Sequence, residues 1–358
     1  MAAHFHELKI KDIKKETAEC VSISFDIPNE LAGQFMFKEG QNITVRKNIN
    51  GEEIRRSYSI CSAPYEKELR VAVKKITGGA FSGFANNDLH PGDMLEVLPP
   101  TGKFNAKLQS NKTGNYLAIA AGSGITPIMS IIKHTLKSQP DSNFTLIYGN
   151  RDRNSIIFFD ELEGLKNKFM NRFNFINILS REKTDAEIFY GRIDEYKLTA
   201  LGKLLPYQSF NEIYLCGPEA LIFSASDYLE KQGVAKSNIH FELFTTPGQN
   251  QVTVKTNEQV ADAGPKSKVT IKLDDRSFDF DLGFNSSSIL DAALKQGADL
   301  PFACKGGVCA TCRAKLVEGE VDMDVNYALE QEEIEQGFIL TCQSHPRSNK
   351  VVVDFDIK

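Results

Sequence analysis

The chain has 358 residues, a length typical of two or three domains. Its 41% hydrophobic and 25% charged residues are ordinary for a globular protein and exclude a disordered, collagen-like or coiled-coil plan. The formal net charge is −5 and there is no basic tract, which argues against a nucleic-acid-binding protein. The most apolar stretch, residues 117–132, is interrupted by glycines and a proline and predicts no membrane span. The N-terminus lacks the apolar core of a signal peptide, so we expect a cytoplasmic protein.

The first 247 residues form two regions that differ in their pattern of predicted strands and helices. Residues 1–110 contain short alternating runs separated by turn-forming residues, which predict an antiparallel barrel or sandwich. Residues 111–247 alternate strand and helix patterns, which predict an α/β domain with a parallel sheet covered on both faces. Strands are expected at 20–27, 41–49, 55–63, 68–76, 116–121, 144–150, 173–180 and 212–217, and helices at 127–138, 158–169 and 219–233.

The last quarter of the chain is expected to be a separate domain. Residues 248–266 are polar and are predicted to form a linker. Residues 267–358 contain a hairpin-like run and a short helix, and carry 10 Lys and Arg against 16 Asp and Glu. Such a charge asymmetry is typical of a separate module or a docking face, although an ordinary solvated surface has the same composition.

Four of the seven cysteines form the strongest signal in the chain. Cys304, Cys309, Cys312 and Cys342 have the spacing C-x4-C-x2-C…C of plant-type [2Fe–2S] sites. Thiolates suit the thiophilic irons of such a cluster, and the neighbouring glycines would let the loop wrap closely around it. Structural zinc sites usually pair C-x2-C twice, and only one such pair is present. The spacing therefore predicts an iron–sulfur cluster.

Two stretches of the predicted barrel are candidate contacts for a flavin. In the run Arg56-Ser57-Tyr58-Ser59, the ring could stack on an isoalloxazine, Ser59 could bond near its reactive nitrogen, and the guanidinium could neutralise phosphate. Gly79 and Ser82 could hold a pyrophosphate, with Val73 and Lys74 just before them. An ordinary strand and a flexible loop would contain the same residues, so both interpretations stay open.

The predicted parallel sheet has candidate contacts for a nicotinamide coenzyme. Gly122, Gly124 and Thr126 lie between a strand and a helix, where such sheets bind ligands, and Cys216 ends another strand. Ser180-Arg181 ends a third strand and suits a ribose 2′-phosphate, which favours NADPH over NADH. A capped turn, a buried cysteine and a surface salt bridge remain the alternatives.

Taken in chain order, these motifs resemble the ferredoxin–NADP reductase superfamily. With a plant-type ferredoxin domain at the C-terminus, the whole chain is similar to oxygenase reductases, and more narrowly to the reductase components of phenylacetyl-CoA epoxidases. The resemblance implies an FAD-binding antiparallel β-barrel, an NAD(P)-binding α/β domain and an α+β β-grasp ferredoxin domain. It also implies that Ser59, Cys216 and Glu242 line the hydride path and that Phe244 lies near the flavin.

The resulting hypothesis is a reductase that passes electrons from NADPH, with NADH as the alternative donor, through FAD and the [2Fe–2S] cluster to a separate oxygenase subunit. No Glu-x-x-His sequence occurs, so a di-iron carboxylate site of that type is not expected in this chain. A reductase for another oxygenase, hydroxylase or desaturase is the alternative enzyme. An iron–sulfur redox-sensing module is the alternative from a different class.

Overall fold

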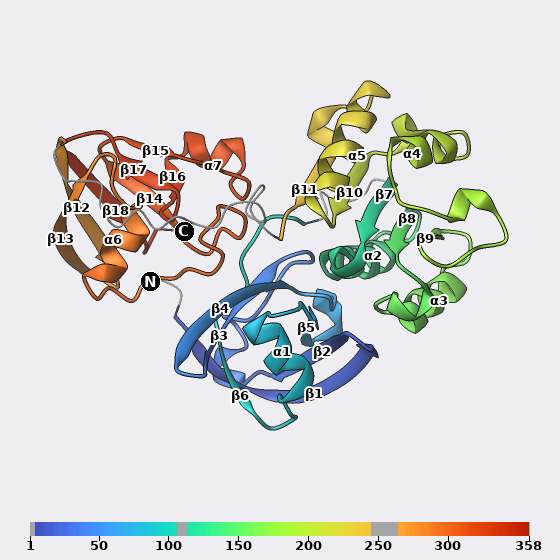
Figure 1. Ribbon diagram of the computed structural model, residues 1–358, viewed down its shortest axis with the longest axis horizontal. Helices are drawn as coiled ribbons and strands as arrows, with labels where there is room; N and C mark the ends of the chain where they lie inside the picture. The colour runs from blue at the N-terminus through green and yellow to red at the C-terminus, as the bar shows by residue number, and fades with distance from the viewer. Residues whose placement is uncertain (1–3, 106–112, 245–263, 358) are drawn as a thin grey trace. The chain divides into compact units, whose positions relative to one another are not determined.

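The computed structural model describes residues 4–105, 113–244 and 264–357. The chain divides into two compact units (Figure 1). The first consists of Glu7–Ile54 and Tyr58–Leu243, and the second of Phe244 onward with two short segments, Met1–His6 and Arg55–Ser57. Most of the predicted linker lies outside the described residues, and its last residue, Lys266, begins a strand.

The first unit contains a six-stranded antiparallel sheet in the order β4-β3-β6-β1-β2-β5. A bridge between Ile60 and Val71 joins the two end strands, which closes the sheet into the predicted barrel. Alternate residues point inward, as Val21, Ile23 and Phe25 of β2 do. The elements are β1 (His6–Thr17), β2 (Cys20–Asp26), β3 (Asn42–Ile49), β4 (Glu52–Ser59), β5 (Leu69–Lys74), α1 (Ala80–Asn87) and β6 (Met94–Val97), with short 3-10 turns η1 (Asn29–Leu31) and η2 (Pro64–Glu66).

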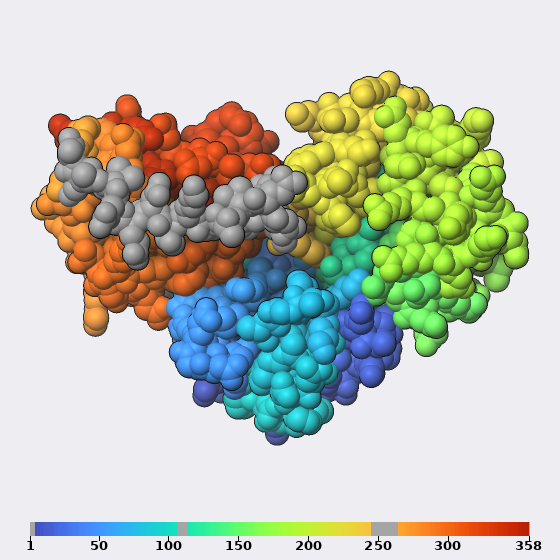
Figure 2. Space-filling view, viewed as in Figure 1, coloured from blue at the N-terminus to red at the C-terminus, as the bar shows by residue number. Residues whose placement is uncertain are grey.

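The same unit contains the predicted parallel sheet, in the order β11-β10-β7-β8-β9. Helices α2 and α3 cover one face and α4 and α5 the other (Figure 1), and α4 and α5 are yellow-green and yellow on the surface in Figure 2. The strands are β7 (Asn115–Ala121), β8 (Asn143–Asn150), β9 (Phe173–Leu179), β10 (Glu212–Cys216) and β11 (Ile239–Glu242). The helices are α2 (Ile125–Ser138), α3 (Phe159–Lys168), α4 (Glu195–Gly202) and α5 (Glu219–Lys231), with 3-10 turns η3 (Gly122–Gly124), η4 (Arg153–Ser155), η5 (Glu187–Phe189), η6 (Tyr207–Ser209) and η7 (Lys236–Asn238).

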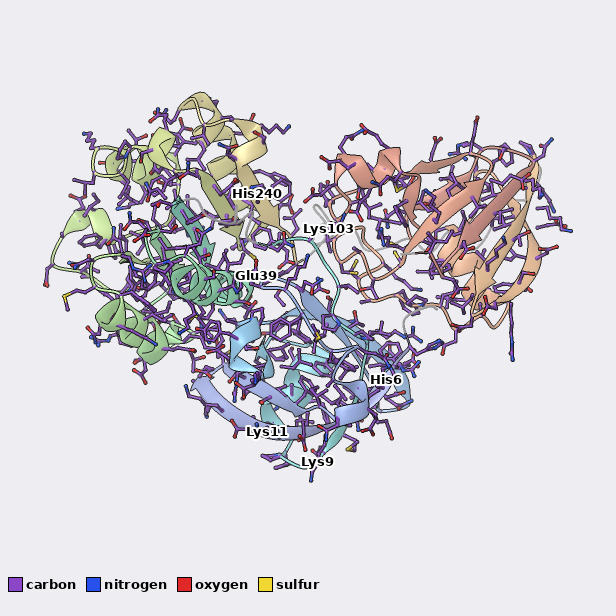
Figure 3. All side chains as sticks on the ribbon, turned by 180° about the vertical axis from the view of Figure 1, so that it is seen from behind. His6, Lys9, Lys11, Glu39, Lys103 and His240 are labelled. Atoms are coloured by element: carbon purple, nitrogen blue, oxygen red, sulfur yellow. The ribbon has the colours of Figure 1, made fainter. Side chains whose placement is uncertain are left out.

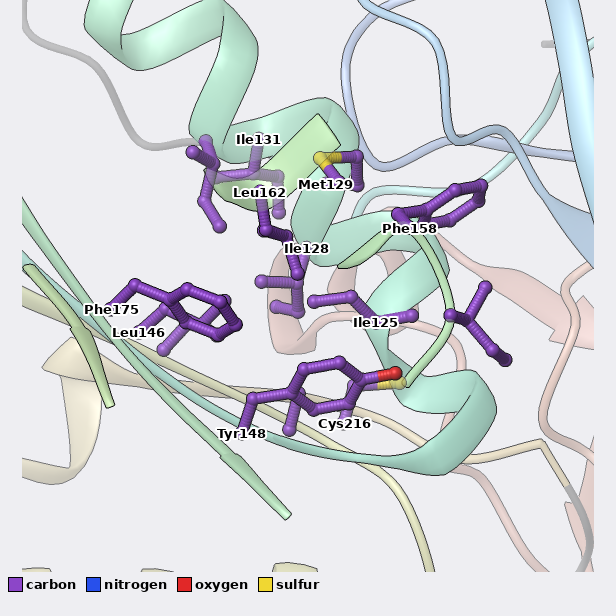
Figure 4. Close-up of a cluster of buried hydrophobic side chains, with 14 of the residues drawn as sticks. Ile125, Ile128, Met129, Ile131, Leu146, Tyr148, Phe158, Leu162, Phe175 and Cys216 are labelled. Atoms are coloured by element: carbon purple, nitrogen blue, oxygen red, sulfur yellow. The ribbon is translucent and has the colours of Figure 1, made fainter. Parts of the chain in front are cut away.

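A buried cluster joins the two sheets of the first unit. Ile125, Ile128 and Met129 of α2 pack against Tyr148 and alternate residues of the parallel sheet (Figure 4). The cluster also includes the barrel residues Cys20, Cys61 and Ala72. Because one cluster contains residues of both sheets, α2 packs between them as part of a common core.

The second unit is an α+β fold built on a five-stranded mixed sheet, β13-β12-β18-β14-β16. Its first hairpin turns at Asp274 and Asp275, both with positive φ, as tight hairpin turns require. The elements are β12 (Lys266–Leu273), β13 (Arg276–Gly283), α6 (Ile289–Lys295), β14 (Arg313–Glu318), β15 (Val321–Met323), α7 (Gln331–Glu335), β16 (Phe338–Leu340), β17 (Ser344–Pro346) and β18 (Lys350–Asp354).

The three predicted fold types are therefore confirmed: an antiparallel barrel, a parallel α/β sheet and an α+β domain at the C-terminus. Within the described residues, no helix combines the length and the apolar character that a bilayer crossing requires.

Candidate functional site

The parallel sheet has a switch point between β7 and β10. From β7 the chain continues outward to β8 and β9, and then returns to the other side of β7 to form β10 and β11. Ligands bind such sheets beyond the carboxyl ends of the strands at this point. Cys216 at the end of β10 pairs with Ala120 near the end of β7. The predicted residues Gly122, Gly124 and Thr126 follow directly after β7.

The turn after β7 needs glycine because it approaches β10 closely. A Cβ on Gly124 would lie 2.1 Å from the carbonyl oxygen of Cys216, so a larger residue would force the two strands apart. Thr126 donates a hydrogen bond from Oγ1 to the carbonyl of Ser123 at 3.0 Å. The turn is thus held tightly at the N-terminal end of α2, where backbone N–H groups favour an anion.

Tyr148 of β8 also holds this turn, and the sequence analysis did not identify it. Its ring is fully buried, and its hydroxyl donates to the carbonyl of Gly122 at 2.8 Å. Figure 4 shows the ring beside Cys216. Gly122 has φ +54, and a Cβ there would lie 3.5 Å from Nζ of Lys74, so this predicted flavin contact lies beside the Gly122–Gly124 turn. In the sequence, only the hydroxyl of a tyrosine near the end of a mostly apolar strand could have indicated this contact.

Ser59, Cys216 and Glu242, which the resemblance assigned to the hydride path, lie together in the structure. Cys216 and Glu242 are register partners at the carboxyl ends of β10 and β11. Ser59, the last residue of β4, donates its hydroxyl to Oε2 of Glu242 at 2.8 Å, although 183 positions separate them in the sequence. The barrel and the parallel sheet therefore meet at this hydrogen bond.

The surroundings of this group raise the pKa values of its two acids, Glu242 and Cys216. Loss of water around Glu242 raises the pKa of its carboxyl from 4.5 to about 7, against the lowering effect of the bond from Ser59. Burial raises the pKa of the Cys216 thiol well above its usual value, and the nearby carboxylate of Glu242 raises it further. Cys216 is thus a neutral thiol and not a nucleophile.

The remaining residues of the predicted flavin run lie on β4. Tyr58 is half-buried, and its ring centroid lies 5.6 Å from that of Phe81 on α1. Arg56 is exposed and donates to the carbonyl of Arg55 at 2.8 Å, while Ser57 is half-buried. Tyr58 thus presents part of its ring to solvent.

The predicted pyrophosphate loop is a tight turn before α1. Oγ of Ser82 accepts a hydrogen bond from the amide of Ile76 at 3.1 Å and donates to the carbonyl of Gly79 at 3.3 Å. Val73 points into the barrel core, so only its backbone is available to a ligand. Its carbonyl accepts a hydrogen bond from the side chain of Asn86.

Ser180 and Arg181 follow β9 at the same edge of the parallel sheet. Ser180 donates from Oγ to the carbonyl of Asn150 at 3.2 Å, and the amide of Arg181 donates to the carbonyl of Arg151 at 2.7 Å. The guanidinium of Arg181 is exposed. Phe244, two residues beyond β11, is also exposed and belongs to the second unit.

The four cysteines of the second unit associate in two pairs. A hydrogen bond from the Cys309 thiol lowers the pKa of Cys304 to about 6, and one from Cys312 lowers that of Cys342. The amide of Gly306 also donates to the sulfur of Cys304 at 3.3 Å.

The loop between α6 and β14 curls around these sulfurs through positive φ at Lys305, Gly307 and Ala310. Two pairs of soft sulfur donors, with an amide directed at one of them, fit a cluster of two irons.

Three family models match the chain. They are the oxidoreductase FAD-binding domain over residues 7–106, the oxidoreductase NAD-binding domain over residues 118–227, and the 2Fe-2S iron-sulfur cluster binding domain over residues 271–347. The chain therefore binds FAD, a nicotinamide coenzyme and a [2Fe–2S] cluster, as the sequence analysis predicted.

Known proteins resemble the chain over its whole length. It is 44% identical to one subunit of the 1,2-phenylacetyl-CoA epoxidase of Escherichia coli (strain K12), covering 99% of this chain and 98% of that protein. It is 31% identical to the ferredoxin reductase component of 3-ketosteroid-9-alpha-monooxygenase from Rhodococcus rhodochrous, covering 97% and 96%. Among solved structures, phthalate dioxygenase reductase superposes with a TM-score of 0.59 at 26% identity and covers 98% of both chains.

Proposed function

The chain belongs to the oxygenase reductases that carry FAD-, NAD- and [2Fe–2S]-binding domains, and we propose that it supplies a phenylacetyl-CoA epoxidase with electrons from NADPH. It is an NAD(P)H-dependent oxidoreductase whose electrons go to an oxygenase partner. The 44% identity to an epoxidase component over nearly the full length supports this choice of partner over the 31% identity to a steroid monooxygenase component.

The observation that carries the proposal is the meeting of Ser59 with Glu242 and Cys216. The strand that bears the flavin run and the strands that border the nicotinamide crevice end at one point, joined by a hydrogen bond of 2.8 Å. Hydride transfer requires the two rings to be held in contact, and a group contributed from both sides can hold them there.

Each residue of this group has a role that needs no nucleophile or metal. Glu242, with a pKa of about 7, can take up or release a proton near neutral pH, and its bond to Ser59 orients the hydroxyl that would face the flavin. Cys216 remains a neutral, polarisable surface against the nicotinamide. Bound FAD supplies the conversion of a two-electron donor into single electrons, which a [2Fe–2S] cluster then relays.

We also propose which residues contact the flavin, the nicotinamide coenzyme and the cluster irons. Tyr58 would lie against the flavin ring, and the thiolates of Cys304, Cys309, Cys312 and Cys342 would ligate the cluster irons. The proposed flavin contacts are Arg56, Ser57, Tyr58, Ser59, Val73, Lys74, Gly79, Ser82 and Phe244, and the proposed nicotinamide contacts are Gly122, Gly124, Thr126, Ser180, Arg181 and Cys216.

We keep 1–110, 111–247, 248–266 and 267–358 as the proposed boundaries of the FAD-binding domain, the NAD(P)-binding domain, the linker and the ferredoxin domain. The cytoplasm is the proposed compartment, because four thiols must stay reduced to ligate iron and all seven cysteines are free.

Reconstitution with the oxygenase component tests the partner. The purified holoprotein is mixed with NADPH, phenylacetyl-CoA and a phenylacetyl-CoA epoxidase preparation that lacks its own reductase. We expect NADPH oxidation coupled to loss of phenylacetyl-CoA. A 3-ketosteroid monooxygenase component is the matched comparison, and faster coupled turnover with that component would overturn the proposed partner.

A further inference from the structure

One face of helix α2 connects the proposed nicotinamide turn, Gly122–Gly124, to the barrel segment that follows Ser59. The helix begins at Ile125, immediately after the Gly122–Gly124 turn. Three side chains on its second and third turns contact barrel residues: Ser130, Lys133 and His134. The same rigid element therefore carries the turn at one end and the barrel contacts further along.

The first contact is a fully buried hydrogen bond. Oγ of Ser130 donates to the carbonyl of Ser62 at 2.6 Å, and both serines have almost no exposed surface. Ser62 lies three residues after Ser59, so this bond fixes the segment that leaves the end of β4. A buried carbonyl that loses its donor is left without a hydrogen bond that it would make in water, so this contact is costly to break.

The second contact is a buried lysine between two carboxylates. Lys133 has 6% of its surface exposed, and its Nζ lies 3.2 Å from Oε2 of Glu66 in turn η2 of the barrel. It also forms an ion pair with Glu161 of α3. Glu66 in turn accepts a hydrogen bond from the amide of Ala63, next to Ser62. Lys133 thus ties α2 and α3 to the same barrel segment.

The third contact reaches the loop that precedes β3. Glu39, labelled in Figure 3, is 7% exposed and lies 3.6 Å from Nε2 of His134. The next residues are bound to the end of β4, since the amide of Ile60 donates to the carbonyl of Gln41 at 2.8 Å. All three contacts therefore reach barrel residues that belong to, or are hydrogen-bonded to, the segment that follows Ser59.

We propose that Ser130 and Lys133 are positioning residues for hydride transfer: they fix the approach of the flavin-side Ser59 to the nicotinamide turn at the start of α2. This inference rests on the proposed function. Neither side chain touches the reacting atoms. They act because a displacement of α2 against β4 by a fraction of an ångström changes the separation of donor and acceptor.

The chain offers a matched set of variants. Lys133→Met removes the charge and keeps the length, while Lys133→Arg keeps the charge. Lys137→Met is the control, because Lys137 lies one turn further along the same helix and is exposed. Ser130→Ala removes only the hydrogen bond to Ser62 and provides a second route if Lys133→Met does not bind FAD.

The flavin-loaded full-length proteins are compared by anaerobic stopped-flow reduction with NADPH and by the charge-transfer absorbance of the reduced flavin with saturating NADP+. For Lys133→Met we expect the limiting reduction rate to fall about tenfold or more. We expect the charge-transfer band to weaken and the dissociation constant of the nucleotide to change little. Lys133→Arg should recover most of the rate and the band, and Lys137→Met should match the wild type.

A loss of folding stability alone would leave the band and the limiting rate of the folded protein unchanged. Wild-type rate and band in folded Lys133→Met, or in Ser130→Ala where the lysine variant fails to load flavin, would therefore overturn the positioning role. A wild-type protein that neither binds FAD nor is reduced by NADPH would overturn the proposed function itself, which is a distinct result.

Discussion

Glu242→Gln tests whether the environment of the Ser59–Glu242 pair raises the pKa of the Glu242 carboxyl. In the folded protein, loss of solvation raises the pKa of Glu242 from 4.5 to about 7. Because folding favours the protonated form, the contribution of this group to stability is fully present below pH 4.5 and is lost as the pH rises through 7. A pKa difference of this size corresponds to about 3 kcal/mol of unfolding free energy.

The assay is urea unfolding of wild type and Glu242→Gln between pH 4.5 and 8, followed by a probe in the first unit. The variant cannot titrate, so we expect its stability relative to wild type to increase across this range. Ser59→Ala is the companion variant: it removes a bond that lowers the pKa, so its titration should move to higher pH. Parallel pH profiles for wild type and Glu242→Gln would show that folding does not raise the pKa of this carboxyl.

Two further substitutions test the crevice. Tyr148→Phe removes the donor to the partly buried carbonyl of Gly122 and should cost about 1 kcal/mol of unfolding free energy. It should also weaken NADP+ binding, measured by calorimetry, whereas unchanged values of both would show that the hydroxyl does not hold the turn. Arg181→Ala should raise the KM for NADPH about tenfold and leave that for NADH nearly unchanged, since only NADPH carries a 2′-phosphate for the guanidinium to bind. An equal effect on the KM for both coenzymes would show that Arg181 does not bind the 2′-phosphate.

The fold could be predicted from the sequence because its signals are local. The strand from Asn143 to Asn150 and the helix from Ile125 to Ser138 were expected within two residues of their observed ends, since apolar periodicity reports which face is buried. The cysteine spacing likewise indicated a cluster because three of the four cysteines occupy a single short loop.

The contacts that assemble the site could not be predicted in this way. No local pattern connects Ser59 to Glu242, and only the family resemblance suggested that both belong to one site. Lys133 resembles an ordinary surface lysine in the sequence, because its two carboxylate partners come from distant segments. Tyr148 could not be identified because it lies in a mostly apolar strand, where a tyrosine is expected only to bury its ring.

In the proposed route, electrons enter at the flavin and leave through the cysteine loop, and the Cys309→Ser variant separates these two steps. NADPH-driven reduction of ferricyanide and NADPH-driven turnover of the epoxidase component are measured side by side for the variant and the wild type. Our account predicts that ferricyanide reduction stays near the wild-type rate while epoxidase turnover is lost. Equal loss of both activities, or turnover that persists without this thiolate, would contradict it.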